Sequence, residues 1–410
     1  MTLQELMTRW NGYQIEMRRW FHQHPEESTK EVRTAERIRA ELDRAGIPWR
    51  PCGLGTGTLA RIEGAQPGRT ILLRGDIDAL SVNEETGLPY ASEVPGVMHA
   101  CGHDCHISML LTAAMIVNEI RDRLKGTIVF AFQPAEELGL GARAMIEEGA
   151  LEGVDACFGM HVWSDYPAGT VALRKGPMMA SGDQFKIHVR GKSTHGAQPQ
   201  LGADALIMGA AIAQNLQTIV SRETYPGDTA VVTVGKFHSG TRFNVVAGTA
   251  ELEGTTRTFS PAVRDRFEEQ ITRIARSTSE AMFLAALITF GLFTLGALAV
   301  AIITPYDQYL RIVPVTVNDP GMIDVVTGAA GKIFGDKGVI EADLQMGGED
   351  FAFYQEKVPG AMVLLGVRNE ACDAVWPQHH GCYKVDESVL VKGAALHVQT
   401  ALDFLGVDLQ

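Results

Sequence analysis

An eight-residue stretch near residue 100 concentrates side chains that bind metals or move protons. It reads His99-Ala-Cys101-Gly-His103-Asp104-Cys105-His106. A thiolate and an imidazole on either side of one glycine can reach the same metal ion, because glycine permits a tight turn. The alternative is a polar helix start, with Asp104 as its cap and the cysteines as small buried residues. We favour a metal site because further candidate ligands occur elsewhere in the chain.

Three short apolar runs, at 70–78, 126–133 and 155–161, are typical of strands buried on both faces. Helical patterns at about 106–124 and 140–149 separate them, which indicates βαβ units and a parallel or mixed sheet. Each run ends in, or leads directly into, polar groups: Asp76 and Asp78, Glu136 and Glu137, and His161. Sites in such sheets lie beyond the carboxyl ends of the strands, so we expect these groups to converge.

The adjacent acids Glu136 and Glu137 can divide the work of a metal site. One carboxylate binds the metal, and the other acts as general acid and base on water. Glutamate is also favoured in the first turn of a solvated helix, which is the alternative for an isolated pair. Beside a Cys-Gly-His cluster, we favour the catalytic interpretation.

The pattern changes at residue 182. A strand at 184–191, a helix at about 203–220, strands at about 229–237 and 247–258, and a helix at about 261–280 resemble the opening of a ferredoxin-like split βαβ module. The α/β pattern resumes after Pro314. We therefore expect an α/β catalytic domain, with a mixed, mainly parallel sheet flanked by helices, that carries an inserted ferredoxin-like α+β domain. The expected segments are 1–181 and 313–410 for the catalytic domain and 182–312 for the insertion.

Histidines in two loops are further candidates. His195 lies in a glycine-rich turn of the inserted domain, where it can donate to a developing oxyanion or be an ordinary surface residue. His379 and His380 lie in a late loop. A dinuclear site needs more ligands than the first 161 residues supply, so one of these two is a natural candidate.

Length, charge and cysteine content exclude several classes of protein. The chain has 410 residues, 46% of them hydrophobic and 21% charged, which fits two folded domains. A net charge of −13 argues against nucleic acid as the main partner. Six cysteines are too sparse for a disulfide scaffold and fit a reducing compartment. The first 20 residues contain no uninterrupted apolar core typical of a signal peptide, so we expect a cytoplasmic protein.

Five motifs carry a resemblance to a known family. Arg-Gly-Asp-Ile-Asp-Ala-Leu, His-Ala-Cys-Gly-His-Asp, Gln-Pro-Ala-Glu-Glu, Gly-Met-His-Val and Met-Gly-Gly-Glu-Asp-Phe occur in this order. The chain resembles the dinuclear metallo-amidohydrolases that include hippurate hydrolases, N-acyl-amino-acid amidohydrolases and plant auxin–amino-acid conjugate hydrolases. The likeness covers nearly the whole chain except about 281–304.

The resemblance implies a role for individual residues. Two divalent metal ions per chain would be held by Cys101, His103, Glu137, His161 and His379, with His380 as second choice for the last ligand. Glu136 would be the general acid and base, and Asp78 the acid that orients the metal site. His195 would polarise the scissile carbonyl, while Asn244 and Arg257 would hold a substrate carboxylate, a task suited to the guanidinium fork. The inserted domain would act as a lid and mediate a homodimer or a dimer of dimers.

The expected reaction is the hydrolysis of an N-acyl amino acid, such as a hippurate-like conjugate, to a carboxylic acid and an amino acid. Zn²⁺ or Mn²⁺ is the metal that we favour, and Co²⁺ or Ni²⁺ also suits these ligands. Two alternatives are a dipeptidase of the same superfamily and a non-catalytic relative that binds metal or attaches to a membrane.

The run from 281 to 304 has no charged residue and is long enough to span a bilayer. A span here would place His379 across the membrane from Cys101, so the two could not share a metal site. We expect instead that the run is buried in the lid or at an interface, where it replaces the last strand of the lid. Arginines that precede the run mimic the charge bias of a membrane segment and keep the alternative open.

Overall fold

The computed structural model describes residues 2–289 and 308–409. Contacts divide the chain into two units. The larger unit comprises Met1–Met178, Thr316–Leu344 and Glu349–Gln410, and the smaller comprises Met179–Val315 and Gln345–Gly348. The smaller unit is thus inserted in the sequence of the larger one.

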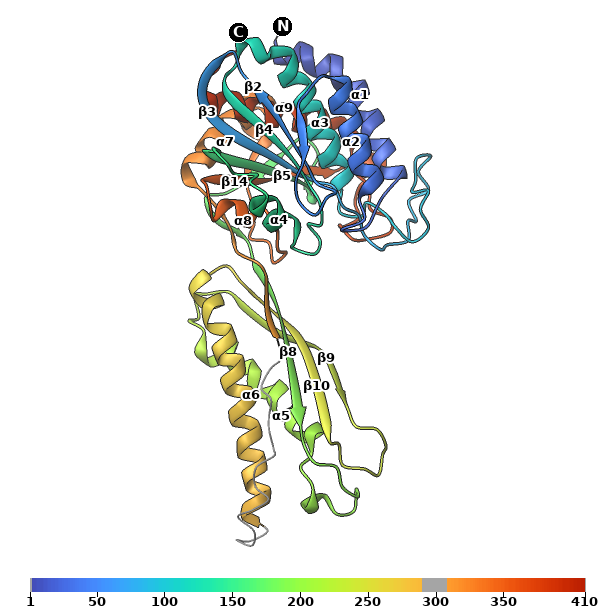
Figure 1. Ribbon diagram of the computed structural model, residues 1–410, viewed down its shortest axis with the longest axis vertical. Helices are drawn as coiled ribbons and strands as arrows, with labels where there is room; N and C mark the ends of the chain where they lie inside the picture. The colour runs from blue at the N-terminus through green and yellow to red at the C-terminus, as the bar shows by residue number, and fades with distance from the viewer. Residues whose placement is uncertain (1, 290–307, 410) are drawn as a thin grey trace. The chain divides into compact units, whose positions relative to one another are not determined.

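An eight-stranded sheet forms the centre of the larger unit, in the order β1-β2-β4-β3-β5-β14-β6-β13 (Figure 1). Its strands are β1 (Trp49–Pro51), β2 (Thr58–Glu63), β3 (Gln66–Asp76), β4 (Lys125–Gln133), β5 (Ala156–Pro167), β6 (Val171–Leu173), β13 (Val339–Glu341) and β14 (Gly360–Arg368). The neighbours β4, β3, β5 and β14 are parallel, whereas β2 joins β4 and β6 joins β14 in antiparallel fashion. The expected mixed, mainly parallel sheet is confirmed. A separate two-stranded sheet pairs β7 (Gly176–Met179) with β12 (Thr316–Asn318).

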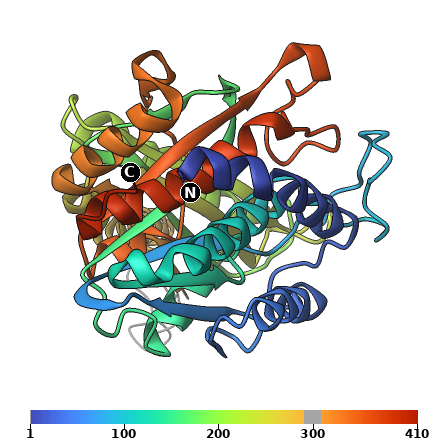
Figure 2. The same cartoon turned by 90° about the horizontal axis from the view of Figure 1, so that it is seen from above.

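Helices pack on the sheet and bury the apolar side chains of its strands. The helices of this unit are α1 (Leu3–Gln23), α2 (Val32–Arg44), α3 (His103–Ile120), α4 (Gly141–Glu147), α7 (Pro320–Phe334), α8 (Ala352–Gln355) and α9 (Leu390–Leu405). Helices α1, α3 and α9 lie side by side (Figure 1, Figure 2), and α3 and α9 contact β3, β4 and β5. In β3, Ile71, Leu72 and Leu73 are fully buried although successive side chains point to opposite faces. The strand is therefore buried on both faces, as its sequence indicates.

The strand β5 is longer than its apolar run suggests. The sequence pattern ends at His161, but pairing with β14 continues from Cys157 to Pro167. His161 therefore lies within the strand, and the expectation that it ends the strand is wrong. The neighbouring strand supplies the backbone partners that keep residues 162–167 extended.

The smaller unit has a four-stranded antiparallel sheet in the order β11-β8-β10-β9. Its elements are β8 (Ser181–Arg190), α5 (Ala205–Thr218), β9 (Ala230–Ser239), β10 (Thr249–Thr258), α6 (Pro261–Thr289) and β11 (Gln308–Val313). The succession β-α-β-β-α-β is that of the ferredoxin-like fold. The strand β11 follows the apolar run and pairs with β8, so the expectation that the run replaces the last strand is wrong.

The apolar run begins inside α6, and its residues 290–304 lie outside the described residues. Within 2–289 and 308–409, no helix is long and apolar enough to cross a membrane.

A buried ion pair ties three elements of the smaller unit together. Asp183 in β8 accepts hydrogen bonds from Nε and Nη2 of Arg264 in α6, at 2.9 and 2.6 Å. It also accepts from the hydroxyl of Tyr309 and the backbone N–H of Ile312 in β11, at 3.1 and 3.2 Å. Both Asp183 and Arg264 are buried. One buried carboxylate therefore links β8 to the helix α6 and to the last strand, β11.

We expect Asp183→Ala to lower the free energy of unfolding by about 3–5 kcal/mol, because it leaves the buried guanidinium of Arg264 without its partner. The control is Asp265→Ala, which removes a surface pair with Arg311 in which the carboxylate is 65% exposed and should change stability by less than about 1 kcal/mol. Urea denaturation of both variants measures the difference. Equal stabilities for the two variants would contradict this role of Asp183.

Candidate metal centre

The candidate ligands of the larger unit gather at one edge of its sheet. Asp76 at the end of β3 pairs with Gln133 at the end of β4, and Arg74 pairs with Gly159 of β5. The same edge of the sheet therefore carries Asp76, the segment that follows β4, and His161. The parallel strands thus bring polar groups together that are far apart in the sequence.

The helix α3 begins at His103, and its start requires a glycine. Gly102 has a φ of 90°, and a Cβ there would lie 2.4 Å from Cγ2 of Val162 and 2.9 Å from the hydroxyl of Tyr383. An L side chain would be strained by this φ and would clash with both neighbours. Gly102 thus allows the chain to turn sharply between Cys101 and His103.

Asp104 is a buried structural anion rather than a helix cap. Its carboxylate lies 3.0 Å from Nε of Arg18 and 2.7 Å from Nδ1 of His22, both in α1. The other ring nitrogen of His22 lies 3.1 Å from Glu84. This network fixes the first turn of α3 to α1, and with it the backbone of His103.

Five candidate ligands lie close together. Ligand atoms of Cys101, His103 and Glu137 are all within 4.8 Å of one another. Nε2 of His161 lies 3.4 Å from Sγ of Cys101, and Nε2 of His379 lies 3.4 Å from Oε1 of Glu137. Two ligand atoms that bind one ion at about 2.1 Å with a tetrahedral angle lie about 3.4 Å apart. These spacings suit shared coordination.

The geometry of the late loop favours His379 over His380 as a ligand. The N–H of His379 donates to the carbonyl of Ala100 at 2.8 Å, which pins the loop beside Cys101. His380 is engaged elsewhere, because its Nδ1 accepts from the N–H of Cys382 at 3.0 Å and its ring stacks on Trp376.

The buried polar atoms of the site fit a cation. Nε2 of His103 and Oε1 of Glu137 are buried and have no hydrogen-bond partner among the described residues. The other ring nitrogen of His103 lies 2.9 Å from the carbonyl of Asp78, which leaves Nε2 as the ligand atom. Although burial opposes it, the carboxylates of Asp76 and Asp78 raise the pKa of His103 to about 10. The site therefore has an excess of negative charge that metal ions would balance.

Asp78 orients the loop that carries a ligand. Its Oδ2 accepts from the hydroxyl of Ser28 at 2.6 Å and from the backbone N–H of Glu137 at 3.1 Å. Its Oδ1 lies 3.3 Å from Nδ1 of His103. One carboxylate thus contacts the segments of two candidate ligands.

Glu136 points into a different group of acids than Glu137. Carboxylate oxygens of Glu136, Glu349 and Asp350 lie within 4.8 Å of one another. Burial and the negative charges of Glu349, Glu137 and Asp350 raise the pKa of Glu136 well above its usual range. A carboxyl group in this environment holds a proton readily, which suits a group that donates one as a general acid.

The sequence patterns did not single out Arg74, which links the two groups. Its fully buried guanidinium lies 2.6 Å from Asp76, 2.9 Å from Glu349 and 2.8 Å from Asp350, and its Nε donates to Gln133 at 2.9 Å. The only signal in the sequence is a charged residue inside an apolar strand, which implies a buried partner.

The remaining predicted residues belong to the smaller unit. His195 and Asn244 lie on adjoining loops, because His195 bridges to Val245 and the N–H of Gly196 donates to the carbonyl of Asn244 at 2.8 Å. Both side chains are exposed.

Arg257 lies in β10 beside Gly182, where a Cβ would come within 1.8 Å of its Nη1. No acidic side chain in the described parts of the chain pairs with Arg257, and burial lowers its pKa. The glycine at 182 leaves room for the guanidinium, which is available to an anion.

Comparison with known proteins places the chain in a family. The family described as peptidase family M20/M25/M40 matches residues 72–403. The chain is 39% identical to N-acetyl-L-cysteine deacetylase of Bacillus subtilis over 387 residues, 94% of this chain and 87% of that protein. It is 35% identical to IAA-amino acid hydrolase ILR1-like 4 of Arabidopsis thaliana, over 96% of this chain and 86% of that protein.

A solved structure from the M20 family also matches this chain. The YXEP protein of Bacillus subtilis, described as a dinuclear metal binding peptidase of the M20 family, is 34% identical. It superimposes with a TM-score of 0.81 over 98% of this chain and all of that one. The chain therefore belongs to peptidase family M20/M25/M40, as a metallo-amidohydrolase.

Proposed function

We propose that this enzyme hydrolyses N-acyl amino acids, of hippurate-like or related type, to a carboxylic acid and an amino acid. The observation that carries the proposal is the pair Glu136 and Glu137, of which one faces the candidate metal ligands and the other a group of buried acids. The N-acetyl-L-cysteine deacetylase and the IAA-amino acid hydrolase among its relatives support this substrate class. They do not favour a dipeptidase or a non-catalytic protein.

Cys101, His103, Glu137, His161 and His379 would hold two divalent ions, with Zn²⁺ or Mn²⁺ favoured over Co²⁺ or Ni²⁺. When bound, the ions would supply Lewis-acid chemistry, which polarises an amide carbonyl and acidifies water. Thiolate and imidazole ligands suit Zn²⁺, and the carboxylates also tolerate Mn²⁺.

Glu136 would move the proton of the reaction. Its carboxylate takes a proton from the attacking water and delivers it to the leaving amine, so that a single group serves as base and then as acid. The raised pKa of this carboxyl group suits the second step, the delivery of the proton to the leaving amine. Asp78 would keep Glu137 and His103 oriented while this occurs.

The smaller unit would contribute the groups that bind the substrate. His195 donates to the oxygen of the scissile carbonyl, and Arg257 with Asn244 binds the carboxylate of the amino acid. Two parallel hydrogen bonds from a guanidinium match a carboxylate. The lack of an acidic partner for Arg257 within the described residues supports this assignment. Formation of a homodimer or a dimer of dimers through this unit, and a cytoplasmic location, stay predictions.

We expect Cys101→Ala and His103→Ala each to lose metal and activity, since each removes a ligand atom from the centre. Elemental analysis after dialysis against a low concentration of chelator measures the loss. The control is Cys105→Ala, which removes a buried thiol from α3, the helix that begins at His103, and this thiol lies outside the ligand groups. Full metal content in Cys101→Ala would show that the thiolate is not a ligand.

Substitution of each of the two adjacent glutamates by glutamine tests their separate roles. Glu136→Gln should keep its metal and lose activity by about a hundredfold or more, because general acid–base catalysis typically contributes that much. Glu137→Gln should lose metal. Metal content and turnover are measured on both variants, and the opposite pattern would reverse the assignment.

His195→Ala should retain its metal and lower kcat more than it raises KM, because a hydrogen bond to the developing oxyanion acts mainly in the transition state. The matched control is His238→Ala, which removes an exposed histidine from β9 of the same unit. Steady-state kinetics with an N-acyl amino acid measure both constants. Wild-type turnover of His195→Ala would make His195 an ordinary surface residue.

A further inference from the structure

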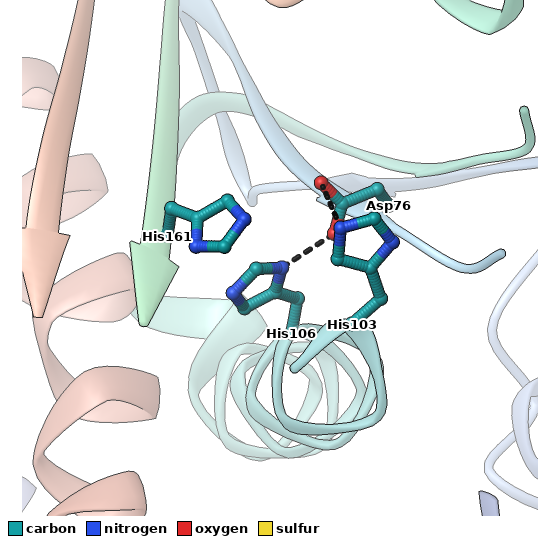
Figure 3. A group of neighbouring side chains, drawn as sticks. All are labelled: Asp76, His103, His106 and His161. Carbon is teal, nitrogen blue, oxygen red and sulfur yellow. Dashed lines mark hydrogen bonds and ion pairs between the residues drawn. The ribbon is translucent and has the colours of Figure 1, made fainter. Parts of the chain in front are cut away.

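A third group, made of four side chains, lies beside the metal centre. Ligand atoms of Asp76, His103, His106 and His161 are all within 4.8 Å of one another (Figure 3). They come from the end of β3, the first turn of α3 and the strand β5. His103 and His161 are already ligands in the proposed function. It remains to decide whether Asp76 and His106 also bind a metal ion.

Both ring nitrogens of His106 are occupied by protein groups. Nδ1 makes a hydrogen bond to Oδ1 of Asp76, drawn in Figure 3, and Nε2 accepts a hydrogen bond from the backbone N–H of Val162 at 2.9 Å. The lone pair of Nε2 is thus in use, and the proton must reside on Nδ1. A neutral imidazole in this state has no free lone pair for a metal ion.

Both oxygens of Asp76 also have donors. Oδ1 accepts from His106, and Oδ2 accepts from Nη1 of the fully buried Arg74 at 2.6 Å. The same Oδ2 lies 3.6 Å from Nε2 of His103. Arg74, Asp76 and His106 therefore form a continuous chain of hydrogen bonds that ends at the backbone of β5.

The ring of His106 also packs against both ligand histidines. Its centroid lies 5.4 Å from that of His103, with the planes 29° apart, and 4.5 Å from that of His161, with the planes 75° apart. Val162, whose N–H the ring accepts, directly follows His161 in β5. His106 thus constrains His103 by packing of the two rings. It constrains His161 by ring packing and also through the hydrogen bond to the next peptide group, that of Val162.

We infer that His106 is a positioning residue that sets the orientation of His103 and His161 for metal binding and does not bind a metal itself. The inference rests on the proposed metal centre. Groups that orient metal ligands from outside the coordination sphere typically change metal affinity by about 10–100-fold.

Two complementary substitutions test the inference. His106→Asn can place an amide N–H near the position of Nδ1 and keep the contact with Asp76, but it loses the contact with Val162. His106→Gln can place an oxygen near the position of Nε2 and keep the contact with Val162, but it loses the contact with Asp76. His106→Phe keeps the ring and removes both hydrogen bonds.

Zinc affinity is measured by competition with a chromophoric chelator, and stoichiometry is measured at saturating Zn²⁺. We expect about 10–100-fold weaker binding for His106→Phe, smaller losses for the Asn and Gln variants, and full stoichiometry at saturation for all three. The visible spectrum of the Co²⁺-loaded protein should change with them, because it reports ligand geometry. The control is His397→Phe, which alters a buried histidine that packs on Phe158 and should leave affinity and spectrum as in wild type.

Two results would overturn the inference and leave the proposed function standing. Wild-type affinity in the Phe variant, which lacks both hydrogen bonds, would mean that neither of them positions a ligand. Loss of one ion at saturation would make His106 a ligand. By contrast, a wild-type protein that binds no divalent ion would contradict the proposed function, and the inference with it.

Discussion

The buried guanidinium of Arg74 is the interaction on which the rest of the site depends. It is fully enclosed and lies within 3 Å of the carboxylates of Asp76, Glu349 and Asp350. The cluster has one positive charge and three acidic side chains, so its acids outnumber its bases. Burial raises the pKa of Asp350 to about 7, although Arg74 acts in the opposite direction. Removal of a partner from a buried ion pair typically costs about 3–5 kcal/mol, so the arrangement is fixed as long as the fold holds.

Two consequences for chemistry follow from this shortage of positive charge. On the side of Asp76, the excess negative charge favours a cation among Cys101, His103 and Glu137, where buried ligand atoms lack partners. On the side of Glu349 and Asp350, it favours a proton on Glu136. The same buried arginine thus lies between the candidate metal ligands and the acids that surround Glu136.

Much of this arrangement can be predicted from the sequence, because the ligand types occur in short motifs and follow buried strands. Cys101, His103 and Glu137 lie together as their positions at the sheet edge suggest. The contacts of Arg74 could not be predicted, since Asp350 is 276 positions away and no local pattern reports which acid meets a buried base. The role of His106 was hidden for a similar reason, because its partner Val162 presents a backbone group that any residue has. The extent of β5 and the strand β11 after the apolar run depend on neighbouring strands rather than on their own residues.

The most direct test is a crystal structure of the metal-loaded enzyme with anomalous scattering recorded at the metal edge. The proposed dinuclear centre should give two peaks about 3.5–4 Å apart, as in other two-metal sites. Cys101, His103, Glu137, His161 and His379 should lie at coordination distance from them, and Asp76 and His106 should lie outside it. A single peak, or a peak coordinated by His106 while one of those five side chains stays unbound, would contradict it.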